Sequence, residues 1–136
     1  MVKTVCRDII ILKRKAEPAT KDDMQIAIDL LDTLKANEAG CVGMAANMIG
    51  IPKAIIAVNM GFVNVAMFNP RIINKSEPYK TSEGCLSLLG VRDTVRYKNI
   101  EIEYYDMNFV KQCKKYSDLI AQIIQHEIDH LDGKII

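Results

Sequence analysis

The chain has 136 residues, of which 49% are hydrophobic, 18 are Lys or Arg and 17 are Asp or Glu. This length and composition are typical of one soluble globular domain spanning residues 1–136, because a chain this short has room for one hydrophobic core and hardly for two. A formal net charge of +1, without a long basic run, argues against a nucleic-acid partner.

The first predicted element in chain order is an amphipathic helix that starts near Thr20 and runs to about Ala36. Thr20 followed by Asp23 resembles a capping box, and apolar residues then recur at helical spacing. The segment from Asn37 to Gly40 supplies a stop signal. We therefore expect this helix to pack one face against the core.

A segment of small residues, from Gly43 to Gly50, follows the helix and permits close backbone approach. Strands are predicted at about 53–59 and 63–69, with Pro52 and Pro70 as boundaries. Residues 99–105 alternate between apolar and polar, which predicts a strand with one wet face, and residues 106–108 resemble a hairpin turn.

The last predicted element is a helix with Ser117 as its N-cap and Gly133 as its stop. It is apolar around much of its circumference, so we expect it to be deeply buried. One helix, several short strands and a buried terminal helix together predict an α+β fold.

The four cysteines, Cys6, Cys41, Cys85 and Cys113, are predicted to be reduced. Arg7 and Asp8 stand where a signal peptide needs its apolar centre, and no apolar stretch reaches the roughly 18 residues of a membrane span. We therefore expect a cytoplasmic protein with no membrane partner, in which disulfides are not required.

Both histidines of the chain lie in the terminal helix, as His126-Glu127-Ile128-Asp129-His130. This HExxH pattern places two imidazoles one turn apart on the same helix face, with a glutamate beside them. The alternative is a pair of core histidines satisfied by hydrogen bonds. Two imidazoles and a carboxylate on an otherwise apolar helix are costly without a compensating cation, so the pattern favours a metal site.

A further protein ligand must lie upstream of the helix, because only six residues follow His130 and the metzincin position for a third histidine is Ile136. The candidates are a Cys or an Asp or Glu. Cys85 stands out within Glu83-Gly84-Cys85-Leu86-Ser87, where the flanking glycine lets the backbone come close to a metal.

Three segments of this sequence, GMAANMIG, EGCLS and HEIDHLDG, resemble the signature motifs of the peptide deformylases. The resemblance implies antiparallel strands around the buried C-terminal HExxH helix. It also implies a hydrolase that removes the formyl group from nascent polypeptides beginning with formylmethionine, in protein biosynthesis at the ribosome. The implied products are formate and a free amino terminus.

The resemblance further implies roles for particular residues. Cys85, His126 and His130 would bind the metal, which is ferrous iron by the resemblance, with zinc or nickel as replacements. Glu127 would act as the acid and base. Substrate-binding roles fall on the backbone N–H of Leu86, which faces the developing oxyanion, and on a groove that includes Val42 and Gly43.

The first motif departs from the family pattern GxGxAAxQxG at two positions. Met48 replaces the glutamine that donates a hydrogen bond to the substrate carbonyl, and a thioether has no donor. Asn47 has suitable chemistry but is one residue out of register, so it would need a backbone shift. Cys41 replaces the first glycine and places a second thiol near the groove.

Three functional hypotheses follow. The first is a metal-dependent deformylase whose rate is reduced by Met48. The second is a deformylase-like protein that binds metal and N-terminal peptides without efficient turnover, and the third is a zinc endopeptidase, which the cysteine disfavours. Glu83 is expected either to orient the Cys85 segment through an arginine such as Arg92 or Arg96 or to form a solvated surface pair. Asp129 is expected at the surface, and the alternative is a carboxylate that supports a ligand histidine or caps the helix.

Overall fold

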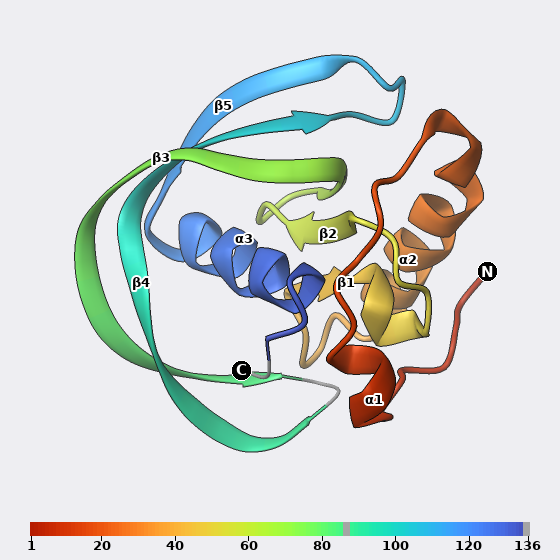
Figure 1. Cartoon of the computed structure of the whole chain (residues 1–136), viewed down its shortest axis with the longest axis horizontal. Coiled ribbons are helices and arrows are strands. Elements are labelled where there is room, and N and C mark those ends of the chain that lie inside the picture. Colours follow the sequence, from red (N-terminus) through yellow and green to blue (C-terminus); the bar gives the residue numbers. More distant parts are fainter. Residues whose placement is uncertain (86–87, 135–136) are drawn as a thin grey trace.

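A computed structural model of the chain describes residues 1–85 and 88–134 (Figure 1). Helical elements predominate up to residue 49, and strands follow one another from residue 55 to residue 117 before the terminal helix. In chain order the elements are α1 (Ile9–Leu12), the 3₁₀ helix η1 (Lys21–Asp23), α2 (Met24–Ala36), β1 (Gly43–Ala45), the 3₁₀ helix η2 (Ala46–Ile49), β2 (Ile55–Asn59), β3 (Asn64–Cys85), β4 (Leu88–Tyr105), β5 (Lys111–Ser117) and α3 (Asp118–Leu131).

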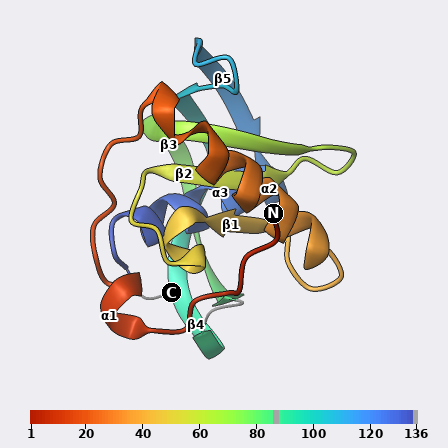
Figure 2. The ribbon, with the colours of Figure 1, turned by 90° about the vertical axis from the view of Figure 1, so that its right-hand side faces the viewer.

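The five strands form one antiparallel sheet in the order β1-β2-β3-β4-β5. Strands β3 and β4 form a long hairpin that bends around α3 (Figure 1). Helix α2 lies across β1 and β2 on the side away from α3 (Figure 2). Cover on both faces explains why β2 is apolar without alternation, with Ile55, Ile56, Ala57 and Val58 all buried. The predicted α+β class, with antiparallel strands around the terminal helix, is confirmed.

The start of the first long helix forms as its sequence predicts. Thr20 accepts a hydrogen bond from the backbone N–H of Asp22, and the Asp23 carboxylate accepts one from the N–H of Thr20 at 2.8 Å. This capping box begins one 3₁₀ turn, η1, and the α-helical part starts at Met24. The helix ends at Ala36, as expected.

Strand β3 is much longer than the strand predicted at 63–69, and Pro70 lies inside it instead of ending it. The pairing with β4 shifts register between Phe68 and Arg71, and Asn69 adopts a positive φ of 51°. This β-bulge accommodates a residue that has no N–H to give to the ladder. The rest of β3 is largely exposed, so it carries no apolar alternation that could reveal it.

Two predictions for the second half of the sheet are confirmed. Ile100, Ile102 and Tyr104 on β4 are buried. At the following turn, the Asp106 carboxylate accepts hydrogen bonds from the backbone N–H groups of Asn108 and Val110.

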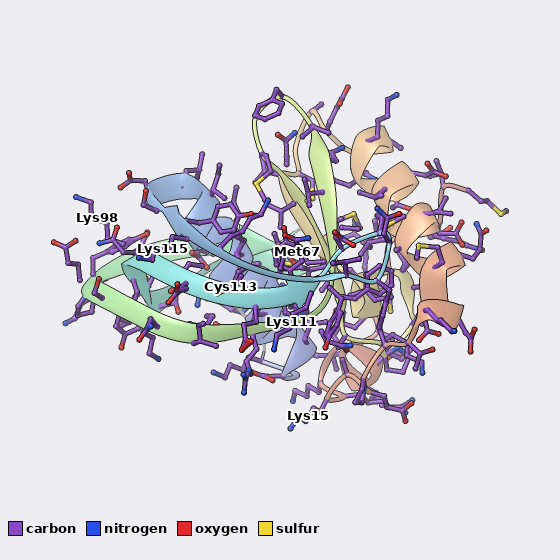
Figure 3. The ribbon with its side chains drawn as sticks, turned by 90° about the horizontal axis from the view of Figure 1, so that it is seen from above. Lys15, Met67, Lys98, Lys111, Cys113 and Lys115 are labelled. Carbon is purple, nitrogen blue, oxygen red and sulfur yellow. The ribbon has the colours of Figure 1, made fainter. Side chains whose placement is uncertain are left out.

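The outer face of the long hairpin is polar and charged (Figure 3). Glu103 on β4 accepts a hydrogen bond from Arg71 on β3 at 2.6 Å and pairs with Lys111 on β5 at 2.8 Å. These pairs link three strands across the solvent side of the sheet and leave its inner side to α3.

Helix α3 begins after Ser117, whose side chain makes no cap hydrogen bond, and it ends before Gly133. Gly133 has a φ of +78°, and a Cβ atom there would lie 2.2 Å from the carbonyl oxygen of Lys13. Only glycine therefore fits where the end of α3 meets the chain that follows α1. No helix in the described residues is long and apolar enough to cross a lipid bilayer.

Candidate metal and catalytic site

The buried face of α3 brings its two histidines together. The Nε2 atoms of His126 and His130 lie 3.0 Å apart, and both residues are buried. The i, i+4 spacing places the two side chains one turn apart on the same helix face. Both rings therefore point their Nε2 lone-pair positions at the same place.

Cys85, the last residue of β3, completes a cluster with these two rings. Its Sγ atom and one ring nitrogen from each histidine all lie within 4.8 Å of one another. Burial works against a charged His126, but hydrogen bonds to Cys85 and Glu83 raise the pKa of its ring to about 10. Burial and the neighbouring His126 lower the pKa of His130 to about 4. One sulfur with two imidazoles is a donor set that fits zinc or ferrous iron.

A buried ionic network surrounds His126 on its far side. Glu83 accepts a hydrogen bond from Nδ1 of His126 at 2.8 Å and one from Gln122 at 2.8 Å. The Nε and Nη2 groups of Arg96 also donate to the Glu83 carboxylate. Burial alone would raise the pKa of Glu83, but these hydrogen bonds lower it to about 2. Arg96 also donates to Asp129 at 2.5 Å. The alternative of a solvated surface pair for Glu83 is wrong, because both Glu83 and Arg96 are buried.

Gln122 was not among the predicted site residues, although its position four residues before His126 places it on the same helix face. The link from Arg96 to Asp129 was also missed. Its two residues are separated by 33 positions, so nothing in the local pattern of either residue indicates it.

Replacing Arg96 with methionine is expected to lower the free energy of unfolding of the metal-free protein by about 3 kcal/mol, because it removes the guanidinium group that pairs with the buried carboxylate of Glu83 and with Asp129. Urea unfolding monitored by circular dichroism measures the change. The matched control is Arg71→Met, which removes an equally short ion pair from an exposed side chain and should cost under about 1 kcal/mol. Equal losses in the two variants would contradict the buried-network interpretation.

Glu127 lies beside the cluster and is 4% exposed. Burial raises the pKa of its carboxyl group to about 7, and its Oε1 atom has no hydrogen-bond partner among the described residues. Strand β1 passes close to it at Gly43, where a Cβ atom would lie 2.9 Å from Oε2 of Glu127 and 2.6 Å from Cγ2 of Ile123. Glycine is therefore what allows the strand to approach this carboxylate.

A cavity of about 270 Å³ opens at the cluster. The segment from Gly40 to Gly43 forms one wall, the end of β3 from Ser82 to Cys85 forms the other, and α3 forms the floor. The predicted residues Val42, Gly43 and Met48 all line this cavity. Leu86 lies outside the described residues, so the position of its backbone N–H is not placed.

The two departures from the motif both bring sulfur to the cavity. Met48 is buried, and its Sδ atom lies 3.4 Å from the backbone N of Ala45. The Cys41 thiol donates to the carbonyl oxygen of Gly43 at 3.0 Å, and burial raises the pKa of this thiol to about 11. Asn47 does not replace the missing amide donor, because its side chain is directed away to the carbonyl oxygen of His130.

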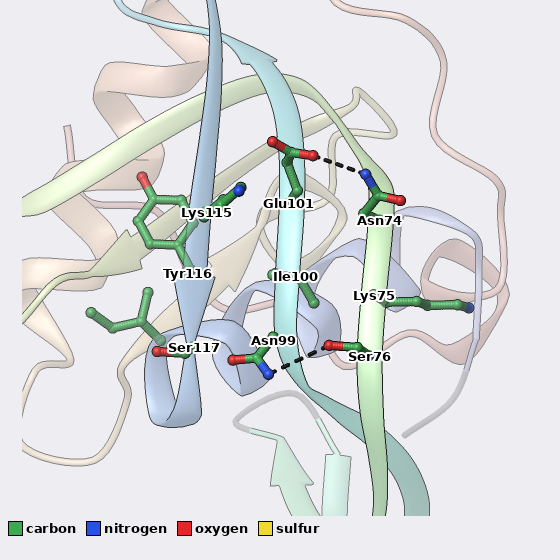
Figure 4. Close-up of a pocket in the computed structure, with 10 residues that line it drawn as sticks. Asn74, Lys75, Ser76, Asn99, Ile100, Glu101, Lys115, Tyr116 and Ser117 are labelled. Carbon is green, nitrogen blue, oxygen red and sulfur yellow. Dashed lines mark hydrogen bonds between the residues drawn. The ribbon is translucent and has the colours of Figure 1, made fainter.

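A second hollow lies over β3, β4 and β5 (Figure 4). Four of its polar side chains bond one another, with Asn74 donating to Glu101 and Asn99 donating to Ser76. None of its ten lining residues is a cysteine or a histidine. The chemistry-bearing groups are thus gathered at the Cys85 cavity.

An antiparallel sheet wrapped around a buried HExxH helix, with a cysteine and two histidines beside a buried glutamate, defines an α+β protein with a hydrolase-type metal site. The family model for polypeptide deformylases matches residues 2–136. A peptide deformylase of Clostridium beijerinckii is 51% identical over 136 residues, which is 100% of each chain.

Solved structures agree with the sequence comparison. The peptide deformylase of Thermotoga maritima has a TM-score of 0.89 at 25% identity, over 99% of this chain and 95% of that one. The enzyme of Thermus thermophilus has a TM-score of 0.88 at 30% identity, over 99% of this chain and 84% of that one. The chain belongs to the polypeptide deformylase family, and the resemblance carried by the three motifs is confirmed.

Proposed function

We propose that residues 1–136 form a single catalytic domain that removes the formyl group from polypeptides beginning with formylmethionine. The products are formate and a free amino terminus. The observation that carries this proposal is the convergence of Cys85, His126 and His130 beside the buried carboxylate of Glu127, at a cavity of about 270 Å³.

Cys85, His126 and His130 would hold the metal ion, for which we propose ferrous iron in the cell, with zinc or nickel as replacements. When bound, the metal lowers the pKa of water towards about 7 and polarises the formyl oxygen. Glu127 takes the proton of the attacking water and delivers it to the departing amine. The Glu83 carboxylate holds Nδ1 of His126, so the Nε2 atom of this ring stays directed at the cluster.

The peptide backbone is proposed to pair with the outer edge of β1, the first strand of the sheet in the part of the chain that the structure describes. Gly43, the first residue of β1, and Val42, which precedes it, both line the cavity. Backbone pairing accepts many sequences, which suits a protein that acts on nascent chains of different composition. The backbone N–H of Leu86 is proposed as an oxyanion donor. We place this reaction in the cytoplasm, on formylated chains at the ribosome.

Metal removal and replacement test the proposed function. Protein prepared without metal should release no formate from formyl-Met-Ala-Ser, and loading with Fe²⁺ should restore release, whereas unrelated formamides should remain uncleaved. The Cys85→Ala variant is the matched control, because it should bind less metal under the same conditions. Protein that carries one Fe²⁺ per chain and releases no formate would refute the proposal, and binding of the formylated peptide without release would favour a binding protein.

A further inference from the structure

Asn47 joins three separate parts of the molecule. It lies in η2, and its side chain is completely buried. Its Nδ2 atom donates to the carbonyl oxygen of His130 at 2.7 Å and reaches that of Leu12 at 3.5 Å. One carboxamide therefore ties the end of α1 and the segment before β2 to the last turn of α3, at a residue of the metal cluster.

Two atoms of these same residues are buried and unpaired. Among the described residues, three buried side-chain nitrogen or oxygen atoms have no hydrogen-bond partner, and they are Oδ1 of Asn47, Nδ1 of His130 and Oε1 of Glu127. The His130 ring directs Nε2 to the cluster, so a neutral ring that binds through Nε2 carries its proton on Nδ1. His130 thus offers a buried donor without an acceptor, and Asn47 offers a buried acceptor without a donor.

We propose that Asn47 is a positioning residue for His130. Its Nδ2 atom fixes the backbone carbonyl of His130, and its Oδ1 atom accepts the Nδ1–H proton of the His130 ring through one buried water molecule. The two residues are already joined by a 2.7 Å hydrogen bond, and two hydrogen bonds that meet at one water near the tetrahedral angle bridge atoms about 4.6 Å apart. This inference rests on the proposed metal binding by His130.

The arrangement gives the two histidines unlike partners. His126 has the Glu83 carboxylate at Nδ1, whereas His130 would have a neutral carboxamide oxygen. An aspartate at position 47 has only acceptor oxygens when it is ionised. It therefore could not donate to the carbonyl oxygens of His130 and Leu12, as Nδ2 of Asn47 does. The amide is the group that serves both atoms of His130 at once.

Zinc-loaded protein with ¹⁵N-labelled histidine tests the proposal by nuclear magnetic resonance. In the wild type, the Nδ1–H proton of His130 should be visible and slow to exchange with solvent. The Asn47→Ala variant should exchange this proton at least about tenfold faster and bind zinc about 10- to 100-fold more weakly. Asn47→Asp should keep the slow proton, because it retains an acceptor, while its zinc affinity falls through loss of the Nδ2 donor.

Asn69→Ala is the matched control, because the Asn69 side chain also bridges two backbone groups, the N–H and carbonyl of Ala19, at 2.8 and 2.9 Å. It should reduce stability without changing zinc affinity or Nδ1–H exchange. Equal effects of the two alanine variants, or an unprotonated or rapidly exchanging Nδ1 in the wild type, would overturn the proposal. The wild-type spectrum decides even if Asn47→Ala does not fold. A protein that binds zinc as expected but releases no formate when loaded with Fe²⁺ would refute the proposed function and leave this inference standing.

Discussion

Replacing Glu127 with glutamine is expected to lower kcat/KM for formyl-Met-Ala-Ser by about 10²- to 10⁴-fold, the usual contribution of a general acid and base. Glutamine has nearly the same shape and fits where Gly43 approaches, but it cannot take a proton from water. Because Glu127 is outside the group of three clustered donors, the metal content of the variant should not change. Formate release and metal analysis on the same preparation measure both quantities.

The control for this prediction is Glu101→Gln, which makes the same chemical change on the outer face of β4, where Glu101 accepts a hydrogen bond from Asn74. Its kcat/KM should equal that of the wild type. A Glu127→Gln protein that retains full metal content and wild-type activity would show that another group moves the proton.

Restoring the amide with Met48→Gln is expected to raise kcat/KM by about 10²- to 10³-fold, the size of the effect usually seen for one oxyanion donor. Met48 lines the cavity and approaches the backbone N of Ala45 through Sδ, with no donor of its own. A glutamine at this position can accept from Ala45 through Oε1, and its Nε2 is then free to donate into the cavity. Steady-state kinetics with formyl-Met-Ala-Ser measure the gain.

Met48→Leu separates the gain of a donor from a change in packing, since leucine is also apolar and of similar volume. It should leave the rate near that of the wild type. If Met48→Gln and Met48→Leu behave alike, no donor is missing at this position, and the low-rate hypothesis based on Met48 would be wrong.

The sequence correctly predicted those elements that depend on interactions between residues close together along the chain. The capping box at Thr20 and the buried alternation of Ile100, Ile102 and Tyr104 both formed as expected. The long hairpin was not predicted beyond residue 69, because Pro70 suggested an end and the exposed strand that follows lacks an apolar pattern. A β-bulge, which is a property of two paired strands, decided otherwise.

The candidate site divides in the same way. Helical spacing by itself places His126 and His130 on one face, and the glycine-flanked segment around Cys85 indicates the third member of the cluster. The sequence left open whether Glu83 pairs with an arginine such as Arg96 or lies at the surface, and the buried pair decides between these alternatives. The hydrogen bond from Gln122 to Glu83 and the direction of the Asn47 side chain were not predicted, because each depends on a residue more than ten positions away.

The amino-acid sequence alone determined the chemistry of this protein: which donors it has, which carboxylate stands beside them and which amide its first motif lacks. Folding decided how those groups are held. The bend of the long hairpin around α3 brings Cys85 to residues about forty positions later, and the surrounding bonds then orient each ring. Such contacts join segments that are remote along the chain, so only the packed sheet and helix could fix them.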